Sequence, residues 1–89
     1  MNYKQFQQII EKMQYKDFGK FLRYKRTKDL PNKSLNSFAF DNSIEPAILS
    51  RVETLKQDIK LSVIEKIANA YKIKISELMK EYEDFITVK

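Results

Sequence analysis

The 89-residue chain contains no cysteine and no histidine. Without cysteine there is neither a disulfide nor a thiol nucleophile, which is compatible with a reducing cytoplasm. The usual zinc ligands are missing as well. No apolar run approaches the length that spans a membrane, and the first residues lack the core of a signal peptide. We therefore expect a cytoplasmic protein with no metal site, no cofactor and no membrane contact.

The chain has one glycine and two prolines, a composition that suits helices far better than turn-rich sheets. Its length makes one domain the default and allows a modest core. Apolar residues make up 43% and occur along the whole length, which argues for a folded protein. Because there is no histidine base and no glycine-rich phosphate loop, we expect no catalytic residues and no enzyme.

Positive charge is concentrated at the start of the chain, and the net charge is +5. Residues 1–33 carry nine Lys and Arg against three carboxylates, whereas residues 34–53 carry one Arg against three carboxylates. A basic balance favours polyanionic partners, although many solvated surfaces have the same composition. Charge alone is therefore weak evidence for nucleic-acid binding.

Helical spacing of apolar residues predicts two helices before Pro31, over residues 3–13 and 16–28. Pro31-Asn32 ends the second helix. The core-facing residues are expected to be Tyr3, Phe6, Ile9, Ile10 and Met13 in the first helix and Phe18, Phe21 and Leu22 in the second. Other faces of the second helix carry Lys16, Lys20, Arg23 and Arg26, which in such a helix are more often solvated than part of a binding stripe.

Residues 34–53 have the pattern of two short helices separated by a tight turn. Ser34 is a natural N-cap for a helix over residues 34–40, and Asp41-Asn42-Ser43 supplies turn chemistry. Pro46 fits the first turn of the next helix, residues 45–54, where its missing N–H is harmless. The core face of that helix is expected to carry Ile48, Leu49 and Val52, and its other faces Ala47, Ser50, Arg51 and Thr54. The pattern is typical of a helix-turn-helix, whose second helix lies in the DNA major groove.

The remaining residues predict a loop and two further helices. Residues 54–60 are polar and are expected to form the loop. Ser62-Val-Ile-Glu65 has the form of a capping box that opens a helix, and Ser76 is expected to cap the last helix. The inward residues are expected to be Val63, Ile64, Ile67, Ala68 and Tyr71, then Leu78, Met79, Tyr82 and Phe85.

Four segments together resemble the Cro/CI-type helix-turn-helix domain, the lambda-repressor-like fold of the Xre family. They are Ser34-x-x-x-x-Ala39, Ile44-Glu45-Pro46, Leu49-Ser50-Arg51-Val52-Glu53 and Leu61-x-x-Ile64-x-x-Ile67-Ala68-x-x-Tyr71. The resemblance covers about residues 17–80 and implies an all-α, compact five-helix domain, which we assign to residues 15–89. Residues 1–14 lie outside the match and are expected to form an extra N-terminal helix. It also implies sequence-specific binding of double-stranded DNA, a homodimer and no enzymatic activity.

The resemblance also indicates which side chains meet DNA. By alignment with the family, Pro46, Ala47, Ser50 and Arg51 occupy positions that face the groove, and Lys56 and Gln57 are placed like residues that contact the backbone. In the turn, Ser43 and Asn42 can reach phosphate. Arg can bind guanine through two hydrogen bonds, Ser can bind a base edge or a phosphate, and apolar groups can touch a thymine methyl.

Several of these residues also have a structural interpretation. Arg51 either reads a base or pairs with a carboxylate such as Glu53 or Asp58, and the motif favours DNA contact. Ser50 either contacts phosphate or is a surface hydroxyl without a role, and Glu53 is expected to bond within the fold. The five tyrosines and six phenylalanines could stack on bases, but their helical spacing favours a core.

The favoured interpretation is a dimeric transcriptional regulator that reads a palindromic operator with helix 45–54 in the major groove. The alternative is an antitoxin-type or protein-interaction helix-turn-helix module whose main partner is a protein, such as a toxin. The extra first helix and the acidic turn around Asp41 and Glu45 keep this alternative open. The first helix either packs on its own domain or forms a dimer seam.

Overall fold

The computed structural model describes residues 2, 4 and 15–87 of the chain. The described residues form five helices and no strand, which confirms the all-α prediction. The helices are α2 (Tyr15–Asp29), α3 (Leu35–Asp41), α4 (Pro46–Glu53), α5 (Leu61–Ala70) and α6 (Ile75–Thr87). The helix expected over residues 3–13 lies almost entirely outside the described residues.

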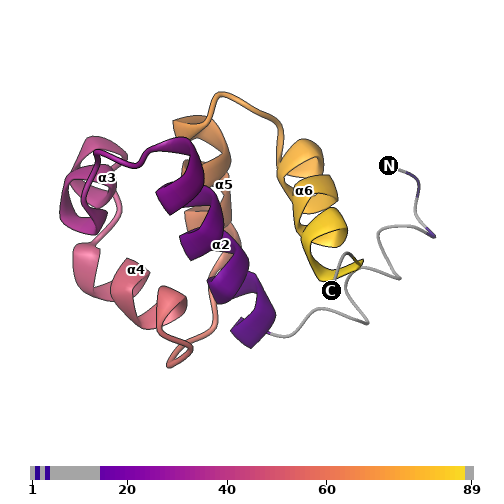
Figure 1. The fold of residues 1–89 in the computed structure, drawn as a ribbon, viewed down its shortest axis with the longest axis horizontal. Helices are drawn as coiled ribbons and strands as arrows, with labels where there is room; N and C mark the ends of the chain where they lie inside the picture. The colour runs from indigo at the N-terminus through magenta and orange to yellow at the C-terminus, as the bar shows by residue number, and fades with distance from the viewer. Residues whose placement is uncertain (1, 3, 5–14, 88–89) are drawn as a thin grey trace.

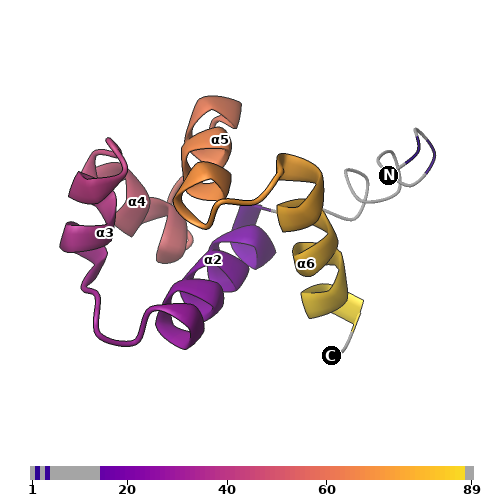
Figure 2. The same cartoon turned by 90° about the horizontal axis from the view of Figure 1, so that it is seen from above.

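Helix α2 runs through the middle of the domain (Figure 1). Helices α3 and α4 lie on one side of α2 and α6 on the other, and the turned view shows α5 behind α2 (Figure 2). Helix α2 packs against both α4 and α6, α3 packs against α4, and α5 packs against α6. One central helix therefore connects the α3–α4 pair to the rest of the molecule.

The core takes side chains from all five helices, as the apolar spacing predicts. Its buried members are Phe18, Phe21, Leu22, Phe38, Ala39, Ile44, Leu49, Val52, Val63, Ile64, Ile67, Ala68, Leu78, Met79 and Tyr82. The ring of Tyr82 meets Phe18 edge-on at 5.1 Å between centroids, a favourable aromatic geometry. Among the described aromatic residues, Tyr24 and Phe40 are exposed exceptions to the prediction of a buried aromatic set.

The predicted N-cap of α3 is confirmed, because the backbone N–H of Ser37 donates to the Ser34 hydroxyl at 3.1 Å. The capping box at Ser62 is wrong. Helix α5 begins at Leu61, and the carbonyl of Lys60 already accepts from Val63 and Ile64, so Ser62 lies inside the first turn.

The cap predicted at Ser76 is also wrong, because α6 begins one residue earlier, at Ile75. The carbonyl of Lys74 accepts from the N–H groups of Glu77 and Leu78. In return the Glu77 carboxylate accepts from the Lys74 N–H at 3.1 Å. This is the acidic half of a capping box, and it places the start of the helix on Lys74.

The single glycine of the chain, Gly19, marks the closest approach of two helices. A Cβ atom built on Gly19 would lie 2.1 Å from the carbonyl oxygen of Val52. No other residue type fits between α2 and the end of α4 without moving one of the two helices. Gly19 therefore fixes how closely α4 packs against α2.

Candidate nucleic-acid interface

The turn between α3 and α4, residues 42–45, is held by hydrogen bonds to α3 and to α5. The amide of Asn42 donates to the carbonyl of Phe38 at 2.8 Å, and buried Ile44 donates its N–H to the Ala39 carbonyl. Ser43 adopts a positive φ of 57°, and the Lys66 ammonium from α5 donates to its carbonyl at 2.8 Å. The turn is thus a defined connection, with the Ser43 side chain exposed.

Helix α4 has an inner and an outer side. Leu49, Val52 and Glu53 are buried and Ile48 is half-buried, so the predicted core face is confirmed. On the outer side Ala47 and Arg51 are exposed, and Ser50 is half-buried. Pro46 occupies the first helical position, as its fixed φ and missing N–H predict. The outer side of α4 is therefore open to a partner in the isolated chain.

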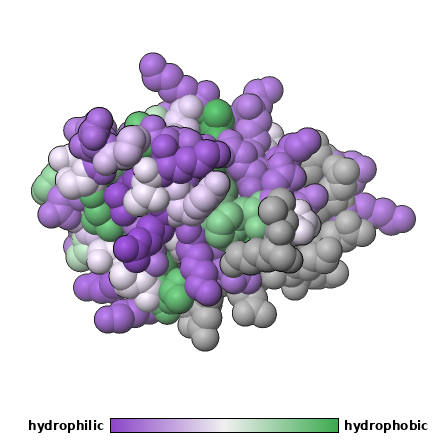
Figure 3. Space-filling view, in the orientation of Figure 1, coloured by the Kyte–Doolittle hydropathy of each residue, from purple (hydrophilic) through white to green (hydrophobic). Residues whose placement is uncertain are grey.

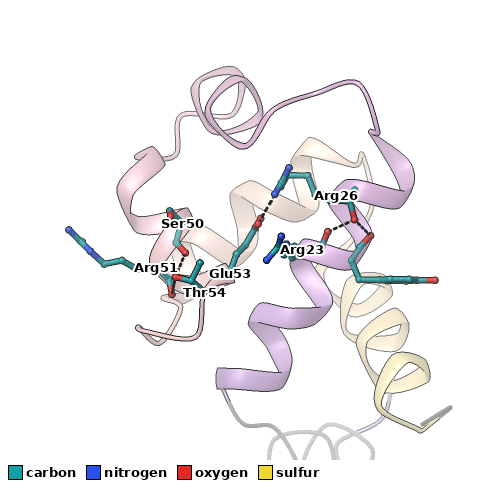
Figure 4. Close-up of polar contacts among 8 residues, drawn as sticks. Arg23, Arg26, Ser50, Arg51, Glu53 and Thr54 are labelled. Carbon is teal, nitrogen blue, oxygen red and sulfur yellow. Dashed lines mark hydrogen bonds and ion pairs between the residues drawn. The ribbon is translucent and has the colours of Figure 1, made fainter.

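A buried ion pair joins the inner side of α4 to α2. The Arg26 guanidinium donates to both carboxylate oxygens of Glu53, at 2.9 and 2.7 Å (Figure 4). The Glu53 side chain is 3% exposed and that of Arg26 is 11% exposed. The hydrogen bonds with Glu53 raise the pKa of Arg26, so the guanidinium stays charged. The structural role expected for Glu53 is confirmed, whereas the placement of Arg26 away from the core is wrong.

Arg51 points away from α2 (Figure 4). Its guanidinium has no hydrogen bond or ion pair with any residue that the structure describes, and Glu53 is occupied by Arg26. The suggested pairing of Arg51 with Glu53 or Asp58 is therefore not present. An unpaired guanidinium on an exposed helix face can bind a carboxylate, a phosphate or a base edge.

The loop after α4 begins with a tight reversal. Thr54 caps the helix by donating its hydroxyl to the Ser50 carbonyl at 2.7 Å, and Leu55 takes a positive φ of 70°. The Lys56 N–H then donates to the Arg51 carbonyl at 2.8 Å. The Lys56 side chain is exposed and Gln57 is half-buried.

The seven residues predicted to bind DNA thus fall into three neighbouring places. Four lie on α4 itself, one lies in the turn before it and two lie in the loop after it: Pro46, Ala47, Ser50 and Arg51, then Ser43, then Lys56 and Gln57. In the space-filling view, apolar residues on the α3–α4 side appear as separate spots among hydrophilic ones (Figure 3). The surface has the character of a polar contact face more than of an apolar docking face.

A second polar cluster joins α2 to α6 on the far side of α2 from α4. The buried Lys25 ammonium donates to Glu81 at 2.6 Å and to Asp29 at 2.9 Å, and it lies 4.4 Å from the centre of the Tyr71 ring. Burial lowers the pKa of Lys25, but these hydrogen bonds more than offset it, so the pKa is raised. Every charge in the cluster has a partner, which indicates a structural role.

Within the described part of the chain, no group of three His, Cys, Asp or Glu residues is placed to hold a metal ion. No helix in that part is both long enough and apolar enough to cross a membrane. Compared with known proteins, the chain matches no family model, no curated protein and no solved structure.

Sequence reasoning missed Gly19 and the partner of Glu53. A lone glycine inside a helical pattern does indicate a packing constraint, so Gly19 could have been singled out. Arg26 lies seven residues after Gly19, which places both on the face of α2 that meets α4. Its partner lies 27 residues away in the sequence, and no local pattern identifies such a pair.

Proposed function

We propose that the chain is a sequence-specific DNA-binding regulator with the lambda-repressor-like arrangement of the Cro/CI-type domains. Helix α4 enters the major groove, and α3 braces it across the backbone. The resemblance of the α3–turn–α4 segment and of α5 to that family supports the proposal. The observation that carries it is the outer side of α4, where Arg51 is exposed and has no ion pair with a described residue, while Arg26 and Glu53 join the inner side to α2.

The proposed contacts follow from the chemistry of each exposed group. Arg51 binds a guanine through two hydrogen bonds, and Ala47 and Pro46 contact a thymine methyl. Ser50 binds a base edge or a phosphate. Ser43, Lys56 and Gln57, at the two ends of α4, bind phosphates on either side of the groove and fix the register of the helix. As a homodimer the protein places two α4 helices about one DNA turn apart, which requires a palindromic operator.

Replacing Arg51 tests the proposal. Arg51→Ala weakens binding to the preferred duplex by about 1–3 kcal/mol and relaxes the preference for one base, because a two-bond contact is lost. Lys80→Ala is the matched control, since it removes one positive charge from an exposed site on α6, away from the α3–turn–α4 segment. The measurement is a fluorescence-anisotropy titration of labelled duplexes. Equal affinity of wild type and Arg51→Ala for the preferred duplex rejects the role of Arg51.

A protein-interaction module is the second candidate, and one observation favours it. Phe40 on α3 is 73% exposed, so its ring is available to an apolar surface of a protein partner. If the wild-type chain binds no duplex but forms a stable complex with the product of a neighbouring gene, loss of that complex in Phe40→Ser favours this candidate. DNA binding that Phe40→Ser leaves unchanged favours the first.

A further inference from the structure

The basic side chains of α2 divide into two sets. Lys25 and Arg26 are buried and bound to carboxylates of other helices. Lys20 and Arg23 are exposed, and neither has an ion pair with a residue that the structure describes. The first set is bound within the fold, so only the exposed set, to which Lys28 also belongs, is available to bind a polyanion.

Arg23 lies at the seam between α2 and α4. Gly19 and Arg26 both contact α4, through the Val52 carbonyl and the Glu53 carboxylate. Arg23 comes four residues after Gly19 and three before Arg26, a spacing that places the three on one side of the helix. Because Arg23 is nevertheless exposed, it lies at the outer edge of the seam.

The seam borders the outer side of α4. Ser50 lies one turn before Glu53, so it lies on the part of α4 next to α2. Arg23 thus flanks α4 on one side, and Arg51 extends from it in the opposite direction (Figure 4). An α-helix about 10–12 Å wide fills a major groove about 12 Å wide, so a side chain at its flank meets the phosphates that border the groove.

We propose that Arg23, assisted by Lys20 on the preceding turn, binds the phosphodiester backbone of the duplex whose groove α4 enters. This inference rests on the proposed function and extends the contact surface from α4 to α2. The guanidinium group matches phosphate with two parallel hydrogen bonds. Since phosphate contacts carry no sequence information, Arg23 contributes affinity for any duplex and does not alter base preference.

The salt dependence of binding tests the proposal. Each phosphate contact contributes about 0.9 to the slope of log K against log salt concentration for duplex DNA. We expect Arg23→Ala to reduce the slope by about that amount and to weaken preferred and random-sequence duplexes by the same factor. Arg23→Lys keeps the charge and is expected to restore the wild-type slope.

Lys28→Ala is the matched control. Lys28 is exposed on the same helix, and its ammonium lies 5.6 Å from the centre of the Tyr24 ring, which packs against Phe85 of α6. Both alanine variants lower the net charge equally, so only position distinguishes them, and circular dichroism verifies that each is folded. A wild-type slope in Arg23→Ala, or an equal reduction in Lys28→Ala, overturns the role of Arg23 alone. A wild-type protein that binds no duplex overturns the proposed function as well.

Discussion

Replacing Glu53 with Gln removes the charge that compensates Arg26 without changing the size of the side chain. The two hydrogen bonds of the pair, 2.9 and 2.7 Å long, connect α2 to the inner side of α4. In the variant the guanidinium remains 11% exposed and charged, with a neutral amide in place of the carboxylate. The free energy of unfolding is therefore expected to fall sharply.

Breaking one partner of a buried ion pair typically costs about 3–5 kcal/mol, since the remaining charge is neither hydrated nor compensated. Small domains have a total stability of about 5–15 kcal/mol. In a domain with one small core, Glu53→Gln is therefore expected to remove a large part of the free energy of unfolding. The same change also loosens α4, so DNA binding is expected to weaken although Glu53 itself faces away from the proposed groove.

Urea denaturation followed by far-ultraviolet circular dichroism measures the effect. Asp41→Asn is the control, because it breaks the Lys33–Asp41 pair, whose side chains are 43% and 53% exposed. That exposed pair is expected to contribute about 0–1 kcal/mol. The double variant Arg26→Met with Glu53→Leu removes both charges and is expected to recover most of the loss. A Glu53→Gln loss no larger than that of Asp41→Asn refutes the reasoning.

Three further expectations concern the helices around this pair. Gly19→Ala is expected to lower the free energy of unfolding by about 1–3 kcal/mol, because the added Cβ would collide with the Val52 carbonyl. Unchanged stability in urea would contradict the close approach of α2 to α4 at this position. Burial raises the pKa of Tyr71, so the folded chain holds this proton above pH 10 while the unfolded chain releases it. Stability should therefore fall as the pH rises beyond about 10, and less steeply in Tyr71→Phe; equal slopes in denaturation at several pH values oppose this. Lys72, which follows α5, has a positive φ of 57°, so Lys72→Gly should stabilise the folded protein by up to about 1 kcal/mol. Lys80→Gly within α6 should destabilise it by a similar amount, and thermal melts that rank the two variants the other way contradict this expectation.

The elements that follow from local chemistry could be predicted from the sequence. Ser34 caps α3, Pro46 opens α4, and the apolar spacing of α5 and α6 identifies their buried faces. The predictions at Ser62 and Ser76 are wrong because each helix begins two residues before the start that a cap at that serine implies, at Leu61 and at Ile75. A serine that resembles a cap is not one when the residue two positions earlier already supplies the first helical carbonyl, as Lys60 and Lys74 do.

The contacts that orient α4 could not be predicted, because they join residues far apart in the chain. Arg26 and Glu53 each resemble a solvated charge in their own helices, and only the packing of α2 on α4 buries them together. Glu53 does not pair with Arg51, because Arg26 already binds both of its carboxylate oxygens. The candidate residues were thus identified by pattern, whereas their availability depends on tertiary contacts.

Selection of bound duplexes from a random-sequence pool tests the central claim most directly. With α4 reading the major groove of a two-fold dimer, the wild-type chain is expected to enrich an inverted repeat whose half-sites are centred about 10 base pairs apart. Arg51→Ala is expected to lose the preference at one position of each half-site. Recovery of a pool no different from the input, with wild type and variant alike, would contradict the account.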